Sequence, residues 1–318
     1  MSIKALGSRA IIGAYYAALE QYTGDSWISN LSMHFDSNQE SETYKWLGQV
    51  PGLRQWIGGR IAKGLDTNGI TIKNLEFEAT LEINRNDMRL DKTGQVLIRI
   101  GDLADRTNIH WAELLSTQIQ NGESQLCYDG SFYFDTTHSE GLSGTQSNKL
   151  AFTLSGFPVT VHGSSTFPSA EEMAVAILQT IQNMLLIKDN QGKVMNAMAK
   201  KFTVMVPVGL MGPAIAAVNN ATLGNNVTNS LVTLASKNGF QIEVEVNPML
   251  NWTNKFAVFR TDARVKPMIR QEEVGVEMKA IAEGSELEFE DNVHHYGVHA
   301  IRNVGFGYWQ YACLAVLS

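Results

Sequence analysis

The chain has 318 residues, more than one hydrophobic core usually holds, so two lobes are expected. A hydrophobic content of 44% with 18% charged residues is typical of a globular protein and excludes an intrinsically disordered one. The net charge of −7 argues against a protein that holds nucleic acid by bulk electrostatics.

Targeting signals are not evident in the sequence. The first ten residues contain two basic groups but no sustained apolar run, so no signal peptide is expected, and no apolar run approaches the length of a membrane span. Cys127 and Cys313 are too few for a disulfide framework, which favours folding inside a cell.

Residues 1–59 are expected to form an N-terminal arm without a core of its own. Helical spacing of apolar residues up to Gln21 predicts a short amphipathic helix, and residues 23–39 carry a large apolar residue every fourth position. Residues 44–60 hold three aromatic residues and four glycines, which indicates an anchored loop. Such an arm must dock either on its own subunit or on a neighbouring one.

Residues 70–83 alternate between apolar residues and acidic or polar ones, which predicts a β-strand with one wet face. Residues 66–69 supply turn chemistry, so a pair of extended strands is expected between Arg60 and Asn84. A helix is predicted directly afterwards, so this segment is expected to lack a long partner of its own and to need cover from another surface. The apolar face consists of Leu75, Phe77, Ala79, Leu81 and Ile83.

Residues 95–122 form the longest periodic segment and predict the helix around which the chain is organised. Apolar or small residues recur there in steps of three and four, which places them on one side of a helix. The part from Asp102 to Asn121 would be about 30 Å long, while Gly101 leaves the start open. Gly122 is expected to end the helix in the left-handed conformation that glycine adopts easily.

Residues 127–138 carry a candidate metal site. Asp129 and Gly130 predict a turn, and Asp129, Asp135 and His138 have side chains that bind metal ions. A metal site needs a closed set of ligands, and no third nitrogen or sulfur donor is expected nearby. The sequence therefore predicts no metal ion here.

Residues 167–282 are expected to form one α/β lobe after a long surface loop at 139–166. Ser169 and Glu172 match the S-x-x-E capping box and predict the start of a helix. Strands and a further alanine-rich helix are predicted at 202–208, 210–221, 241–246 and 255–261.

The chain is strand-like again from Val274 and ends in an apolar run. A terminus of this kind is normally buried. The apolar side of the long helix is the expected cover, so Trp111, Leu114 and Leu115 are predicted to form the core against these last strands.

Three histidines in this region, His294, His295 and His299, lie near acidic residues and could bind zinc or act as bases. Their spacing matches no mechanistic pattern, and in a strand His294 faces away from the other two. Phosphate-binding, nucleophile-elbow and zinc-protease motifs are missing from the sequence. No catalytic, cofactor-binding or metal-binding residue is therefore assigned. A structural protein is favoured over an enzyme, with a metal-dependent hydrolase that uses these histidines as the alternative.

Four groups of residues resemble a known family. They are Tyr44–Gly48 with Trp56–Arg60; Thr71–Asn74 with Phe77–Thr80 and Asn84–Asp87; Cys127–Gly130 with Phe134–His138; and Gly297, Arg302, Gly305, Gly307 and Trp309–Ala312. In their order and spacing they resemble the Mu-like phage major head subunit family over nearly the whole chain.

This resemblance implies an α+β fold of the Hong Kong 97-type capsid class. The parts it implies are an N-terminal arm at 1–59, an extended β-hairpin loop at 60–88, a peripheral domain with a long spine helix at 89–166, an axial α/β domain at 167–282, and strands that return to the peripheral domain at 283–318. It also implies that an adjacent subunit covers the extended loop. The residues expected to make this contact are Trp56, Arg60, Leu75, Phe77 and Leu81.

The implied function is that of a major capsid protein, neither an enzyme nor a cofactor-binding protein. Hexamers and pentamers of the chain would build an icosahedral shell around the double-stranded DNA of a tailed phage or prophage, with non-specific DNA contacts and no membrane. Scaffold, portal and decoration proteins would be the partners, and assembly would occur in the bacterial host cytoplasm. An encapsulin-like compartment that encloses cargo proteins is the alternative within the same fold.

Overall fold

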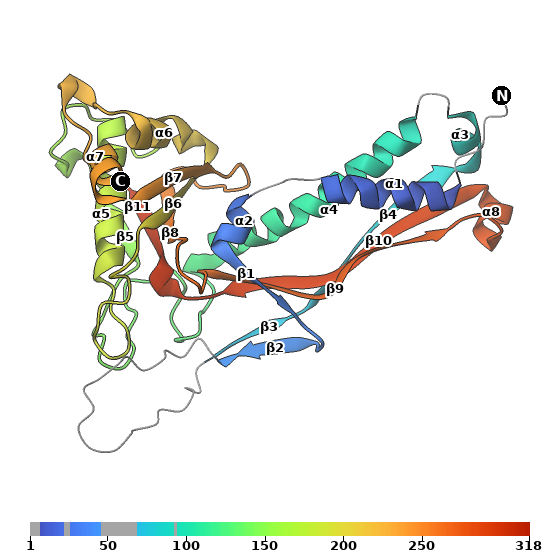
Figure 1. Cartoon of the computed structure of the whole chain (residues 1–318), viewed down its shortest axis with the longest axis horizontal. Coiled ribbons are helices and arrows are strands. Elements are labelled where there is room, and N and C mark those ends of the chain that lie inside the picture. Colours follow the sequence, from blue (N-terminus) through green and yellow to red (C-terminus); the bar gives the residue numbers. More distant parts are fainter. Residues whose placement is uncertain (1–6, 22–25, 46–68, 92–93) are drawn as a thin grey trace, which may run out of the picture.

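A computed structural model describes residues 7–21, 26–45, 69–91 and 94–318 of the chain. Figure 1 shows two lobes, which we call the compact lobe, with the C-terminus, and the elongated lobe, which extends away from it. Each lobe is built on one large sheet, and the described residues also form a separate two-stranded sheet. Among the described helices, none combines the length and the apolar character needed to cross a membrane.

The elongated lobe contains a sheet of four strands in the order β1 (Ser32–Asp36), β9 (Met268–Ile281), β10 (Val293–Phe306) and β4 (Leu75–Asn84). The central strand β10 runs antiparallel to both β9 and β4, and β1 lies parallel to β9. Helices α1 (Ser8–Gln21) and α4 (Gln95–Gln120) lie along this sheet (Figure 1). Their buried apolar residues meet those of β4, β9 and β10 in one core cluster.

The strand β4 has a long partner in its own chain, so the expectation that it has none is wrong. All of its residues, from Leu75 to Asn84, pair with β10. The strand before it, β3 (Ile70–Lys73), pairs instead with β2 (Ser41–Tyr44). The extended pair expected between Arg60 and Asn84 is thus two separate pairings. Residues 46–68, with most of the predicted turn, lie outside the described residues.

The spine helix α4 begins at Gln95, as the predicted segment does, and runs through Gly101. Its first turn is capped by Asp91, whose carboxylate accepts hydrogen bonds from the amides of Gln95 (3.1 Å) and Val96 (2.9 Å). A carboxylate at this end also interacts favourably with the helix dipole. Gly101 therefore makes the helix less stable than another residue would, but it does not mark the start of the helix.

The predicted role of Gly122 is also corrected. It lies in a 3-10 turn, Asn121–Glu123, and does not adopt the left-handed conformation. A Cβ atom at this position would come within 2.5 Å of the ring of Phe134. Glycine is needed here because the loop after the helix packs its aromatic side chains onto the helix end.

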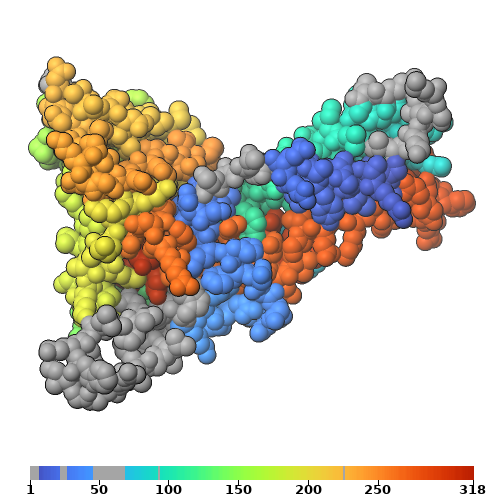
Figure 2. Space-filling view, viewed as in Figure 1, coloured from blue at the N-terminus to red at the C-terminus, as the bar shows by residue number. Residues whose placement is uncertain are grey.

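The N-terminal segment docks on its own subunit as far as it is described. The hydroxyl group of Tyr15 in α1 bonds Thr107 of α4 at 3.0 Å. In α2 (Ser26–Leu31), Trp27 and Leu31 join a core cluster shared by both lobes. Figure 2 shows this blue segment across the junction between the lobes on the displayed face. The predicted helix before Gln21 is confirmed, with a start at Ser8.

The compact lobe has five strands in the order β5 (Lys149–Phe152), β11 (Ala312–Leu317), β8 (Lys255–Arg260), β6 (Lys201–Val206) and β7 (Gln241–Val246). Three helices pack on this sheet: α5 (Ala170–Leu186), α6 (Met211–Asn219) and α7 (Ser230–Asn238). The predicted strands β6, β7 and β8 and the helices α5 and α6 are confirmed. The strand β5 lies in what was expected to be a surface loop, because four residues are too short for a periodic signal. The remaining short helices are α3 (Arg85–Leu90) and α8 (Glu286–Asp291).

The last two strands, β10 and β11, lie in different lobes. Strand β10 packs near α4, as the sequence indicates, whereas β11 lies inside the five-stranded sheet of the compact lobe. The crossing is a short segment from Gly307 through a 3-10 turn at Trp309–Tyr311. The expected domain boundary at residue 282 falls between β9 and β10. These two strands nevertheless pair with each other in the sheet of the elongated lobe.

The predicted capping box is present at the start of α5, and its glutamate makes further contacts with the loop before the helix. The carboxylate of Glu172 accepts hydrogen bonds from the amides of Ser169 (2.8 Å) and Gly163 (2.9 Å) and lies 3.0 Å from Nδ1 of His162. Burial alone would raise the pKa of Glu172, but these hydrogen bonds outweigh it and hold the pKa below its usual value. The ionised carboxylate therefore fastens the preceding loop to the helix.

Acidification is expected to remove this fastening. Because the pKa of Glu172 is lowered by folding, its contribution to stability is present above the unfolded pKa of about 4.3 and is lost as the pH falls through the folded pKa. The variant Glu172→Gln should lose about 1–3 kcal/mol at pH 7, because the amide cannot satisfy every buried donor. As the pH falls, the difference in melting temperature between this variant and the wild type should become smaller. A constant gap between the two from pH 7 to pH 3 would contradict this assignment.

Candidate functional site

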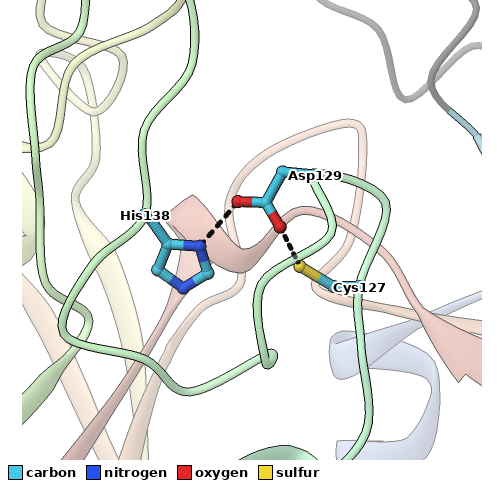
Figure 3. Close-up of side chains that lie close together, drawn as sticks. All are labelled: Cys127, Asp129 and His138. Carbon is cyan, nitrogen blue, oxygen red and sulfur yellow. Dashed lines mark hydrogen bonds and ion pairs between the residues drawn. The ribbon is translucent and has the colours of Figure 1, made fainter.

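The most concentrated group of chemically active side chains lies in the loop after α4. Cys127, Asp129 and His138 meet there, with Asp129 between the other two (Figure 3). The Cys127 thiol donates to Oδ1 of Asp129 at 2.9 Å, and Nδ1 of His138 lies 2.6 Å from Oδ2. Gly130 follows with φ of +83°, so the predicted turn is confirmed and reverses the chain beside the carboxylate.

The charges of this group are set by burial and by these hydrogen bonds. Burial would raise the pKa of Asp129, but the hydrogen bonds from His138 and Cys127 lower it overall. Burial, with the nearby Asp129 charge, raises the pKa of the Cys127 thiol far above its usual value. A protonated thiol bonded to a carboxylate is no nucleophile at neutral pH, because nucleophilic attack requires a thiolate and an adjacent base.

Two further residues hold the His138 ring. Its Nε2 lies 3.2 Å from Oδ1 of Asn148, and its plane stacks on the indole of Trp309 at 3.8 Å and 6°. The amide nitrogen of Asn148 donates to the carbonyl oxygens of Tyr133 (2.8 Å) and Trp309 (3.3 Å). The group is therefore fixed to the segment where the chain crosses between the lobes.

The structure changes the predicted membership of this group. Asp135 is not part of it, because its Oδ1 accepts from the amides of Thr136 (2.6 Å) and Thr137 (3.0 Å) in its own turn. The expectation that no sulfur donor lies nearby is wrong, since Cys127 supplies one. Cys127 could have been recognised in the sequence, because it lies two residues before Asp129. The glycine turn that follows brings the chain back toward His138.

The three histidines of β10 do not converge. His295 and His299 lie on one face and reach Glu82 (3.0 Å) and Glu76 (2.8 Å) on the neighbouring strand. His294 lies on the opposite, buried face, 3.2 Å from Glu288. The predicted alternation is confirmed, and each ring faces a different carboxylate. Within the described part of the chain, the only group of donors close enough for a metal ion is the one around Asp129.

The residues predicted for subunit contact differ in exposure. Trp56 and Arg60 lie outside the described residues. Leu75 is 44% exposed at the start of β4. Phe77 is half-buried, with its ring centre 4.3 Å from that of His110 in α4, and Leu81 packs against the core between α4 and the sheet. Part of the face expected to need an adjacent subunit is therefore covered within the chain.

The predicted spine residues are also not equivalent. Leu115 is fully buried. Trp111 and Leu114 are only half-buried and pack at the edge of the same cluster. The guanidinium groups of Arg302 and Arg270 lie over the Trp111 ring, 4.7 Å and 5.4 Å from its centre. The expectation that Trp111 is buried in the core is therefore wrong, because the ring packs at the edge of the cluster against cationic side chains of the sheet.

Comparison with known proteins gives consistent relatives. The family model described as Mu-like prophage major head subunit gpT matches residues 8–159 and 235–316. The major capsid protein of Escherichia phage Mu is 32% identical over 113 residues, which are 36% of this chain and 37% of that protein. The Mu-like prophage FluMu major head subunit of Haemophilus influenzae is 34% identical over 113 residues, with the same coverage of 36% and 37%. The aligned part thus spans little more than a third of these relatives.

The structural comparison covers more of the chain. A chain from the procapsid of bacteriophage JBD30 is similar with a TM-score of 0.56 over 97% of this chain and 74% of that chain, at 21% identity. This likeness concerns the fold. The mixture of helices and sheets is that of phage capsid subunits, so the predicted α+β fold of the Hong Kong 97 type is confirmed.

Proposed function

Because the chain belongs to the Mu-like prophage major head subunit gpT family, we propose that it is a major capsid protein that self-assembles into an icosahedral shell around double-stranded DNA. The match of the family model to segments of both lobes carries this proposal. The net charge of −7 suits a container whose wall must not bind its DNA tightly.

The lobes support a division of the subunit for assembly. In this proposal the elongated lobe is the peripheral domain and the compact lobe is the axial domain. The extended loop is the hairpin of β2 and β3 and not residues 60–88, because β4 is part of the four-stranded sheet. Buried hydrogen bonds hold this pair of strands to β9, because Gln271 accepts one from the Tyr44 hydroxyl group and donates one to Oδ1 of Asn74, both at 2.7 Å.

The proposed partners follow from the shell. Copies of the chain would meet as hexamers and pentamers in contacts that close by symmetry. Scaffold, portal and decoration proteins would act in the host cytoplasm, and the product would be the virion capsid. Negative-stain microscopy of the purified chain should show closed particles. Small soluble oligomers at assembly concentrations would contradict the proposal, and particles that hold proteins in place of DNA would favour the compartment alternative.

Leu75 is the described residue most suited to test the subunit contact. Its side chain is 44% exposed on an edge strand, where an apolar group without cover favours association. Leu75→Asp should leave circular dichroism and melting temperature near those of the wild type and remove the fast particle peak in sedimentation. Phe77→Asp is the contrasting variant. It should lower the melting temperature itself, because that ring packs on His110.

Normal particles from Leu75→Asp would show that this residue faces solvent in the shell. An unchanged melting temperature in Phe77→Asp would show that the face of β4 is not covered by α4.

A further inference from the structure

The group around Asp129 has the donor atoms of a transition-metal site. The Cys127 sulfur, an Asp129 oxygen and a His138 nitrogen all lie within 4.8 Å of one another. The side chains of His138 and Asp129 are 0% and 2% exposed. Thiolate sulfur, imidazole nitrogen and carboxylate oxygen are the three kinds of ligand that zinc takes in proteins. Figure 3 shows the Cys127 sulfur and the His138 ring both directed at the Asp129 carboxylate, which lies between them.

The neighbours of His138 orient it as a metal ligand. The amide nitrogen of Asn148 is engaged by two carbonyl groups, so its oxygen faces Nε2 of His138 at 3.2 Å. An oxygen acceptor there places a hydrogen on Nε2 and leaves Nδ1 facing Asp129. Metal-binding histidines are held in this way, with the second ring nitrogen donating to an oxygen of the protein. The stacked Trp309 ring keeps the imidazole in this plane.

Binding of a divalent ion would release the proton of the Cys127 thiol, because the thiolate is the form that binds metal ions. The three side chains would leave a fourth position of a tetrahedral zinc site to water.

We propose that Cys127, Asp129 and His138 form a zinc-binding site that fixes the loop after the spine helix to the crossing between the two lobes. The site belongs to the folded subunit and does not depend on its assembly. The alternative is that hydrogen bonds alone hold these three side chains together. In that case the group would have no affinity for metal ions.

Cobalt(II) is the direct probe, because a cobalt–thiolate bond gives a charge-transfer absorption in the near ultraviolet. The full chain, treated with chelator and then dialysed, should develop this band and saturate at one equivalent, and zinc should remove it. Cys127→Ser should abolish the band, while Cys313→Ser should retain it, because Cys313 is buried in the sheet of the compact lobe. A folded wild-type chain without the band would overturn the proposal, even if Cys127→Ser fails to fold.

Zinc content and thermal stability provide a second measurement. Zinc should raise the melting temperature of the wild type, since a ligand that binds only the folded state stabilises it, and should not raise that of Asp129→Asn. The double variant His295→Gln with His299→Gln should keep one zinc ion per chain. Loss of zinc in that variant, or an equal thermal shift in Asp129→Asn, would place the metal elsewhere and overturn the assignment.

Discussion

Replacement of Trp309 by alanine is expected to lower the free energy of unfolding by about 3–5 kcal/mol. Trp309 is the largest fully buried side chain among the described residues and lies where the chain passes from β10 to β11. Its ring stacks on His138, and its carbonyl group accepts a hydrogen bond from Asn148. The truncation therefore leaves a cavity at the junction of the lobes and also frees the histidine.

This loss can be measured by denaturant unfolding of the unassembled subunit, followed by circular dichroism. Trp111→Ala is the matched control, because Trp111 is only half-buried and its contacts are with the guanidinium groups of Arg270 and Arg302. Such cation–π contacts contribute about 0.5–2 kcal/mol, so the control should lose clearly less. Equal losses would show that the junction is no more important for stability than the face of the spine helix.

Gly307→Ala is expected to destabilise the subunit by about 1–3 kcal/mol without removing any contact. A Cβ atom there would lie 2.4 Å from the carbonyl oxygen of Lys266 and 3.1 Å from the carbonyl group of Pro267. These are backbone atoms and cannot rotate away. The amide of Gly307 also bonds the Pro267 oxygen at 2.8 Å, so relief of the clash would disturb that hydrogen bond.

The control for this variant is Gly275→Ala in β9, where an added Cβ atom meets nothing within 4 Å. It should unfold near the wild-type midpoint, because alanine reduces the freedom of the unfolded chain and meets no obstacle. If the unfolding midpoint shifted equally in Gly307→Ala and Gly275→Ala, the effect at Gly307 would come from strand propensity and not from the close approach of the backbone.

Local features of the fold were predictable because they depend on neighbouring residues. The capping box of Ser169 and Glu172 and the alternation in β7 and β10 identify their elements by period and end chemistry alone. The partner of β4 was not predictable, because a strand pattern states which face is apolar and not which distant segment pairs with it. Glu76 and His299 are in contact although they are 223 residues apart in the chain.

The candidate site shows the same limit on a smaller scale. His138 and Asp129 were recognisable as possible ligands by residue type. The choice between Cys127 and Asp135 as their neighbour depended on how the loop turns at Gly130, since both lie within the same short segment. Gly122 was misassigned for a related reason, because the contact that requires glycine comes from Phe134, beyond the helix.

The pairing of β4 with β10 sets an order of events during synthesis. A ribosome that has completed β4 must translate more than 200 further residues before β10 is available, as the separation of Glu76 and His299 indicates. At about 5–20 residues per second, this delay is on the order of 10–40 s. Until then, the nascent chain has no finished sheet to cover the apolar side of α4. A transcript cut short before β10 therefore yields a polypeptide without a complete elongated lobe, whose α4 lacks the strand that packs beside it.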